Sequence, residues 1–430
     1  MLTYIKKKED FYSQIIHLYL HTIFIYLLYK SVFGKTNIEG IIIFISSILF
    51  SIYLYLKKNT IFPRYSLFIL ITPAIILGLQ YFFHHIPVLT TVPNTIITID
   101  QIFSMYNLNY TYGLAFLFFP FLIINSHYSY KSLFKLILIF SIVYILYNIY
   151  IGLKLHFNRD DLAVYFKVLI TYDSINILLA GLLYIYSFYL YETLAKKWLS
   201  FLVLFIATLS LIINITHGTR GTWLVLPFLF SITIPYYFKS CKKYFYQQLA
   251  TLIFIGSIII GFKSELIFSR IIAAYQDFSL FHSQPSTPTS IGSRLTMWQH
   301  AITDFEHSPI IGISTFKVSE QICHLSQTGI ITGNCLTHMH SIYFQELASH
   351  GMIGFIGLLL SFILPMYFLY KIKPILPHQK LCKAAALFTI ISTMICGLTD
   401  FYFITAVASS VYYCFVLTLC AFLVKTTDAT

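Results

Sequence analysis

Residues 337–370 read THMHSIYFQELASHGMIGFIGLLLSFILPMYFLY, a stretch in which two histidines lead directly into a long apolar run. The polar residues before it extend back to about Lys263, and almost everything else in the chain is apolar. The run 342–370 is long enough to cross a bilayer, which a helix of about 20 residues can do. The sequence therefore places a large polar loop, residues 263–341, at a membrane surface.

The composition of the whole chain supports this. Of its 430 residues, 58% are hydrophobic and only 10% are charged, whereas soluble proteins carry about 25% charged residues. No cleavable signal peptide is expected, because the apolar run after the basic residues 6–8 is itself long enough to span. Twelve apolar runs are expected to be transmembrane helices, namely 11–33, 38–56, 66–83, 111–125, 133–153, 168–191, 198–217, 221–238, 247–262, 342–370, 382–399 and 401–424.

The distribution of lysine and arginine sets the expected orientation. With a cytoplasmic N-terminus, the cytoplasmic segments hold 18 of the 28 basic residues, namely Lys6, Lys7, Lys8, Lys57, Lys58, Arg64, Lys131, Lys135, Lys196, Lys197, Lys239, Lys242, Lys243, Lys371, Lys373, Lys380, Lys383 and Lys425. Cytoplasmic loops are enriched in these residues, so both termini are expected inside and residues 263–341 outside. The net charge of +12 is then a topology signal and does not indicate nucleic-acid binding.

We therefore predict an all-α polytopic membrane protein with about 12 transmembrane helices. Residues 1–262 should contain the first nine, and residues 342–430 the last three. Between them, residues 263–341 should form one large outer loop that contains short amphipathic helices and active-site elements.

Seven cysteines form no metal-binding pattern. Cys323 and Cys335 are the two that fall in the outer loop. An oxidising compartment would permit a disulfide between them, and two free thiols are the alternative.

Two arginines on the outer side could bind an anion. Arg220 lies between two spans in THGTRGTW (216–223), where a helix start favours anions and a guanidinium adds a planar fork. Arg294 lies in SIGSRLTMW (290–298), which has the spacing of an amphipathic surface helix. With Ser293 as the N-cap, Arg294 falls in the first turn, where a cation hints at an anionic partner. A snorkelling or solvated arginine is the alternative for each.

Three ionisable residues flank the last spans. His338 and His340 are candidates for proton transfer, because an imidazole titrates near neutral pH. In a helix, residues two apart point away from each other, so we expect only one of them to face a given site, which disfavours a metal pair. Asp400 is either an ion-pair partner of a site arginine or a water-exposed turn residue. A smooth helix face for close packing is expected from Gly351, Gly354 and Gly357.

Taken together, these residues resemble the O-antigen ligase family, polytopic enzymes that attach O-antigen to lipid A–core. The most specific likeness is His340-Ser341, then nine residues, then Gly351-Met352-Ile353-Gly354. It is similar to the family signature His-[Asn/Ser/Gln]-x9-Gly-x-x-[Gly/Thr/Tyr], which ligases share with polymerases. Asparagine is common where Ser341 stands, and the signature tolerates serine.

Further segments extend the resemblance over roughly residues 150 to 400. Residues 216–223 and 290–313 resemble the arginine-containing segments of the family. The run ending at Asp400 resembles a late acidic position, and Asn158-Arg159 resembles a small outer loop.

The resemblance implies a glycan donor on undecaprenyl diphosphate and an acceptor sugar hydroxyl on lipid A–core. It also implies a bacterial inner membrane, with the active site in the periplasm. His340 is the expected general base, and Arg220 and Arg294 are expected to stabilise the diphosphate. Further substrate contacts are expected from Arg159, His338 and Asp400. We expect no metal and no other cofactor, and a single displacement with inversion.

Other functions stay open at this point. An O-antigen polymerase uses the same donor, and a protein O-oligosaccharyltransferase is a more distant alternative that is usually longer. A lipid-linked glycan transporter would also have about twelve helices, but it predicts charged residues at mid-membrane and pseudo-symmetric halves. Here the notable polar groups gather on the outer side, which argues against a transporter.

Overall fold

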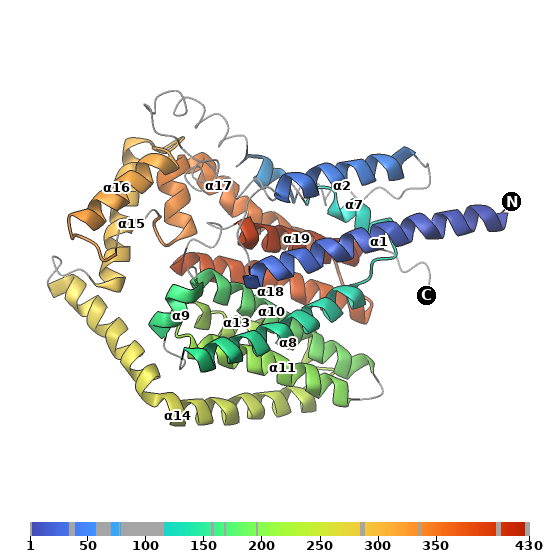
Figure 1. Cartoon of the computed structure of the whole chain (residues 1–430), viewed down its shortest axis with the longest axis horizontal. Helices are drawn as coiled ribbons and strands as arrows, with labels where there is room; N and C mark the ends of the chain where they lie inside the picture. The colour runs from blue at the N-terminus through green and yellow to red at the C-terminus, as the bar shows by residue number, and fades with distance from the viewer. Residues whose placement is uncertain are drawn as a thin grey trace.

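The structure is a computed structural model of the whole chain, shown in Figure 1. It describes residues 2–33, 39–56, 70–76, 78, 116–155, 159–166, 169–194, 197–283, 289–333, 336, 338–400 and 406–425. Within these ranges the regular elements are all α-helices. The predicted all-α class is therefore confirmed.

The first helices in chain order are α1 (Leu2–Phe33), α2 (Glu39–Leu56), α7 (Phe119–Ile124), α8 (Tyr130–Lys154), α9 (Arg159–Phe166), α10 (Leu169–Thr193), α11 (Trp198–Thr216) and α12 (Arg220–Trp223). They are followed by α13 (Leu226–Tyr237), α14 (Lys242–Ser283), α15 (Ser290–His307), α16 (Thr315–Gln327), α17 (Ile342–Lys371), α18 (Pro377–Thr399) and α19 (Ala406–Val424).

Among the described residues, six helices are long and apolar enough to cross a membrane. These spans are Tyr130–Lys154, Leu169–Thr193, Trp198–Thr216, Ile342–Lys371, Pro377–Thr399 and Val407–Val424. The chain is thus a polytopic membrane protein. Twelve spans stay a prediction, because the predicted spans at 66–83 and 111–125 lie partly outside the described ranges.

Helix α10 is the centre of the bundle. It packs against α8, α11 and α18, and it is buried along nearly its whole length. A helix that is apolar on every side is either surrounded by lipid or buried among other helices, and α10 is buried among other helices. A side chain on α10 can therefore reach several neighbouring helices, which matters for the polar residues near its start.

Helices α17 and α18 form an antiparallel pair. Helix α17 begins next to His340 and ends at Lys371, and α18 returns to end next to Asp400. The two helices pack against each other, so His340 and Asp400 lie at the same end of the bundle. Figure 1 shows this end at the left, together with α9, α15 and α16.

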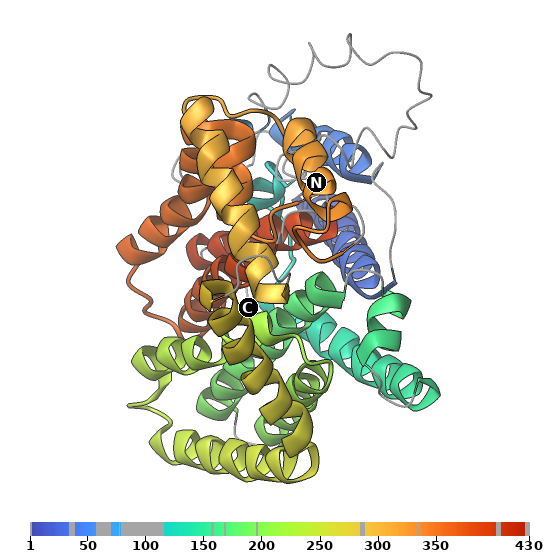
Figure 2. The ribbon, with the colours of Figure 1, turned by 90° about the vertical axis from the view of Figure 1, so that its left-hand side faces the viewer.

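The predicted loop begins as a continuous helix. Helix α14 runs through residue 262, where we predicted the last span before the loop to end, and stops only at Ser283. It leads to α15 and α16, which carry a small apolar core of their own against the start of α17. Figure 2 looks directly at this end and shows α15 and α16 beside the first turns of α17.

Helix α15 starts earlier than predicted. Thr289 is its N-cap, and the Thr289 Oγ1 accepts a hydrogen bond from the Gly292 backbone N–H at 3.0 Å. Our choice of Ser293 as the N-cap was wrong, because the sequence offers two capping residues four positions apart. Arg294 therefore lies beyond the first turn, and its position along α15 no longer argues for an anion.

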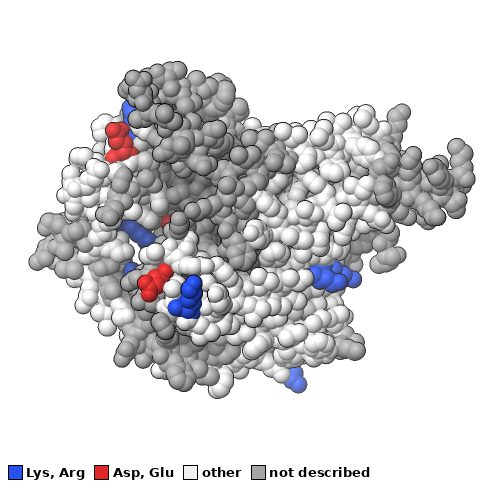
Figure 3. All heavy atoms as spheres, viewed as in Figure 1, with Lys and Arg blue, Asp and Glu red and all other residues white. Residues whose placement is uncertain are grey.

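Charged side chains are sparse on the visible face of the molecule. In Figure 3 the described surface is mostly white, with red and blue groups gathered on the left and a few blue groups right of centre and at the lower edge. An uncharged band of this kind is expected where lipid surrounds a helical bundle.

Candidate active site

A break in α17 fixes the loop between α15 and α16. At Gly351 the helix adopts a φ of 61°, so the backbone groups around it lose their helical partners. The segment from Pro309 to Ser314 supplies replacements, with four backbone hydrogen bonds across the break. Two of them run from the N–H groups of Ile313 and Ser314, and two from those of Met352 and Ile353.

Two glycines make this approach possible. A Cβ on Gly351 would lie 2.6 Å from the Ile310 carbonyl carbon, and one on Gly312 would lie 2.3 Å from the Ser349 carbonyl carbon. Both glycines also have a positive φ, which side chains disfavour. The prediction that Gly351 contributes to a smooth helix face was therefore wrong, because this glycine breaks the helix instead.

The segment bearing the two histidines is fixed at Met339. The Trp298 indole Nε1–H donates to the Met339 carbonyl at 3.0 Å, and the Met339 N–H donates to the Gln345 Oε1 at 2.9 Å. His340 follows with a φ of 50°, a conformation that residues with side chains rarely adopt. Such backbone strain is typical of functional sites, where surrounding contacts maintain it.

Both histidine rings approach the carboxyl group of Asp400. The His340 Nδ1 lies 3.2 Å from the Asp400 Oδ1, and the His338 Nε2 lies 3.8 Å from the same oxygen. The two ring centroids are 4.2 Å apart. The expectation that only one histidine faces the site was wrong, because α17 begins at Ile342 and the helical geometry behind that expectation does not apply to residues 338–340.

Arg294 lies close enough to both Asp400 and Arg220 to feel their charges. Burial lowers the pKa of Arg294, the charge of Arg220 lowers it further, and the charge of Asp400 opposes both. Gly221 brings the turn that carries Arg220 against the end of α18, since a Cβ there would lie 2.1 Å from the Thr399 Oγ1. Arg294 on α15 thus lies between the buried Asp400 and Arg220, whose turn packs on the end of α18.

The surroundings of His340 and Asp400 shift the pKa values of both side chains. Burial lowers the pKa of His340 from its ordinary 6.5, and the charges of His338 and Arg294 lower it further, whereas Asp400 raises it. Burial alone would raise the pKa of Asp400, but the hydrogen bonds and charges of the two histidines hold it well below its usual range. Asp400 is therefore ionised, and it accepts the hydrogen bond from the His340 Nδ1–H, which leaves the lone pair on Nε2.

Ligand atoms of His338, His340 and Asp400 lie within 4.8 Å of one another, so these side chains could in principle bind one metal ion. The two arginines argue for an anion at this place instead, because two guanidinium groups repel a divalent cation. The arrangement can accept a proton at His340 and stabilise negative charge at the arginines.

Arg159 and the two loop cysteines are only partly described by the structure. Arg159 begins α9, which packs on α10, but its side chain lies outside the described residues. Cys323 in α16 is disulfide-bonded. Its predicted partner, Cys335, also lies outside the described residues.

Comparison with known proteins bears on these residues. Residues 204–359 match the model of the O-antigen ligase family. This stretch is therefore similar to O-antigen ligases. The matched residues include Arg220, Arg294, His338 and His340, whereas Asp400 lies beyond the match, at the end of α18.

A curated relative is similar over part of the chain. It is an uncharacterized protein of Haemophilus influenzae, 26% identical over 204 residues, which cover 46% of this chain and 50% of the relative. The chain thus spans about half the length of the relative that it matches.

Several residues that position the site were missed from the sequence. Trp298 and Gln345 hold the Met339 backbone, and Asp173 on α10 lies under the turn that carries Arg220. Trp298 lay within the segment that resembles the family, but its target, a backbone carbonyl, could not be read from the sequence. Asp173 offered one signal, since a carboxylate within a predicted span is costly and usually functional.

Proposed function

We propose that the protein is an O-antigen ligase that transfers O-antigen glycan from undecaprenyl diphosphate to a sugar hydroxyl of lipid A–core. The observation that carries this proposal is the His340–Asp400 pair beside Arg294 and Arg220 at one end of the bundle. A base next to two cations suits a reaction in which a hydroxyl loses its proton and a diphosphate departs.

His340 is the general base in this proposal. Asp400 accepts from Nδ1–H, orients the ring and stabilises the imidazolium that forms. The His340 Nε2 takes the proton of the acceptor hydroxyl as its oxygen attacks the anomeric carbon of the donor glycan. A lowered pKa suits this role, since the ring is then neutral and ready to accept a proton near neutral pH.

Arg220 and Arg294 stabilise the leaving group. As the bond between the anomeric carbon and the phosphate oxygen breaks, its electron pair stays with undecaprenyl diphosphate. Two guanidinium groups supply hydrogen bonds and positive charge where this negative charge develops. Attack from the side opposite the diphosphate inverts the anomeric centre, and the proton on His340 passes to water. No metal or other cofactor takes part in these steps.

Remaining substrate contacts follow the same proposal. His338 lies near the Asp400 carboxyl group and would contact the acceptor, and Arg159 at the start of α9 would contact the donor. Lipids of the bacterial inner membrane surround the bundle. The lysines at the far end of α17 and in the segment before α18 support a periplasmic site and cytoplasmic termini.

The test is the lipopolysaccharide profile of a deletion strain, measured beside its pool of lipid-linked O-antigen. A ligase predicts bare complete core and long polymerised chains that accumulate on undecaprenyl diphosphate. Core that carries a single repeat unit would instead identify a polymerase. An unchanged profile would contradict both functions and favour a transporter or a protein O-oligosaccharyltransferase.

A further inference from the structure

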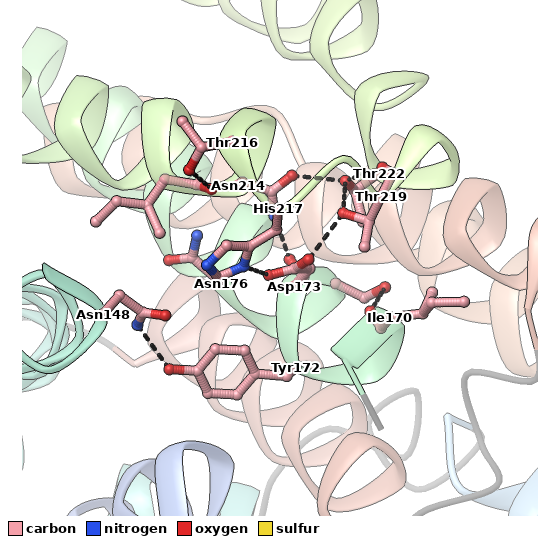
Figure 4. Close-up of polar contacts among 12 residues, drawn as sticks. Asn148, Ile170, Tyr172, Asp173, Asn176, Asn214, Thr216, His217, Thr219 and Thr222 are labelled. Carbon is pink, nitrogen blue, oxygen red and sulfur yellow. Dashed lines mark hydrogen bonds and ion pairs between the residues drawn. The ribbon is translucent and has the colours of Figure 1, made fainter. Parts of the chain in front are cut away.

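A buried carboxyl group lies under the turn that carries Arg220. Asp173, in the second turn of α10, is fully buried. Its Oδ1 lies 2.7 Å from the His217 Nδ1, and its Oδ2 accepts a hydrogen bond from the Thr219 hydroxyl at 2.8 Å. Figure 4 shows Asp173 between these two side chains.

The same network extends to both sides of Arg220. Asn214, at the end of α11, donates to the Asp173 carbonyl at 2.8 Å, and its Oδ1 accepts from the Thr222 hydroxyl at 2.6 Å. Thr222 also lies 3.1 Å from the Thr219 hydroxyl. Side chains before and after Arg220 are thus connected to one residue of α10, as Figure 4 shows.

The connection matters because the turn has little else to define it. Helix α12 has only four residues, its N-cap Thr219 makes no side-chain capping bond, and Gly218 has a φ of 71°. The Thr219 hydroxyl binds Asp173 instead of capping α12. A short helix of this kind is not stable by itself, so the contacts to α10 and α18 set its direction.

We propose that Asp173 is a positioning residue for Arg220, acting through Thr219 and His217. The carboxyl group holds the turn so that the Arg220 side chain is placed near Arg294, where the donor diphosphate would bind. This inference rests on the proposed function of Arg220 in donor binding. A buried acid within a membrane helix costs free energy, and a positioning role explains why this acid is present.

The test measures binding of undecaprenyl diphosphate to the purified full chain in lipid nanodiscs. Asp173→Asn preserves the shape of the side chain and removes its charge. We expect roughly tenfold weaker binding, a size typical of coupling between contacting groups. Asn176→Ala is the matched control, because Asn176 is buried on the same helix and donates to the Ser210 carbonyl of α11 instead of to the Arg220 turn. This control should bind as the wild type does.

A double-mutant cycle separates positioning from general destabilisation. In the Arg220→Ala background, Asp173→Asn should change binding less than twofold, since its effect passes through Arg220. An equal loss in both backgrounds would overturn the inference, as would wild-type binding by Asp173→Asn. Thr219→Val, which removes only the hydroxyl, gives the same test if Asp173→Asn does not fold.

The cycle also distinguishes failure of the inference from failure of the proposed function. If Arg220→Ala itself binds as the wild type does, Arg220 does not bind the donor, and both ideas fall. If Arg220→Ala loses binding while Asp173→Asn and Thr219→Val retain it, only the positioning role of Asp173 is wrong.

Discussion

The two sides of the candidate site are held in different ways. On the side of His340, backbone hydrogen bonds join residues 309–314 to the break in α17, and glycines with positive φ allow it. On the side of Arg220, a network centred on the Asp173 side chain holds a four-residue helix. The backbone contacts require glycines at particular positions, and these can be recognised in a sequence. The side-chain network is distributed over residues 173–222 and has no pattern that can be recognised in this way.

The largest effect should come from the base itself. His340→Ala should lower the transfer rate by about 10²–10⁴, the usual contribution of a general base, while His338→Ala should retain activity. Transfer of glycan from lipid-linked donor to core by membranes of each variant checks this. An inactive His338→Ala beside an active His340→Ala would show that the two roles are reversed.

The loss of either arginine should lower the transfer rate nearly as much as the loss of His340. Arg220→Ala and Arg294→Ala should each lower transfer by about 10²–10³ at near-normal abundance, since each removes charge stabilisation of the leaving group. Lysine should restore little activity, because it is a point charge and not a planar fork. Lys317→Ala, which removes an exposed cation on α16, is the control and should be fully active. Equal activity of the arginine variants and this control would contradict the proposed role.

A single added Cβ at Gly351 should disrupt the backbone contacts between residues 309–314 and the break in α17. Gly351→Ala forces a side chain into a conformation, φ 61° and ψ −154°, that is essentially reserved for glycine, at about 1–3 kcal/mol, and adds an overlap with Ile310. We expect a lower thermal unfolding midpoint and lower abundance. Gly261→Ala on α14 should be neutral, because a Cβ there meets no atom within 4 Å. Equal midpoints for the two variants would show that the break in α17 needs no glycine.

The smallest effects concern pH. The pKa of His340 is lowered, so kcat/KM should fall only below pH 6.5 as the ring becomes protonated. Asp400 raises this pKa, so Asp400→Asn should move the acidic limb of the profile to lower pH in addition to slowing transfer. His338 lowers it, so His338→Ala should move the limb to higher pH. Shifts in the same direction for both variants would contradict the assignment of the limb to His340.

The sequence predicted the chemistry of the site better than its geometry. The helical class and the set of Arg220, Arg294, His340 and Asp400 followed from hydropathy and from the resemblance, and the structure brings these four side chains together. The sequence did not predict that both histidines face Asp400, because the positive φ of His340 cannot be inferred from its residue type.

Other features were hidden for different physical reasons. Thr289 and Ser293 are both residue types that are favoured as N-caps, so the packing of the loop decides between them. In the structure, Ser293 instead accepts a hydrogen bond from the Thr332 N–H. The network around Asp173 joins residues more than forty positions apart, and a single sequence does not show such pairs.

The most direct test is transfer by the purified protein in lipid vesicles. The reaction would contain undecaprenyl diphosphate-linked O-antigen, lipid A–core and EDTA, with wild type and His340→Ala compared side by side. We expect glycan on the core with the wild type despite the chelator, and none above background with His340→Ala. Transfer that stops on addition of EDTA, or that continues in His340→Ala, would contradict this expectation.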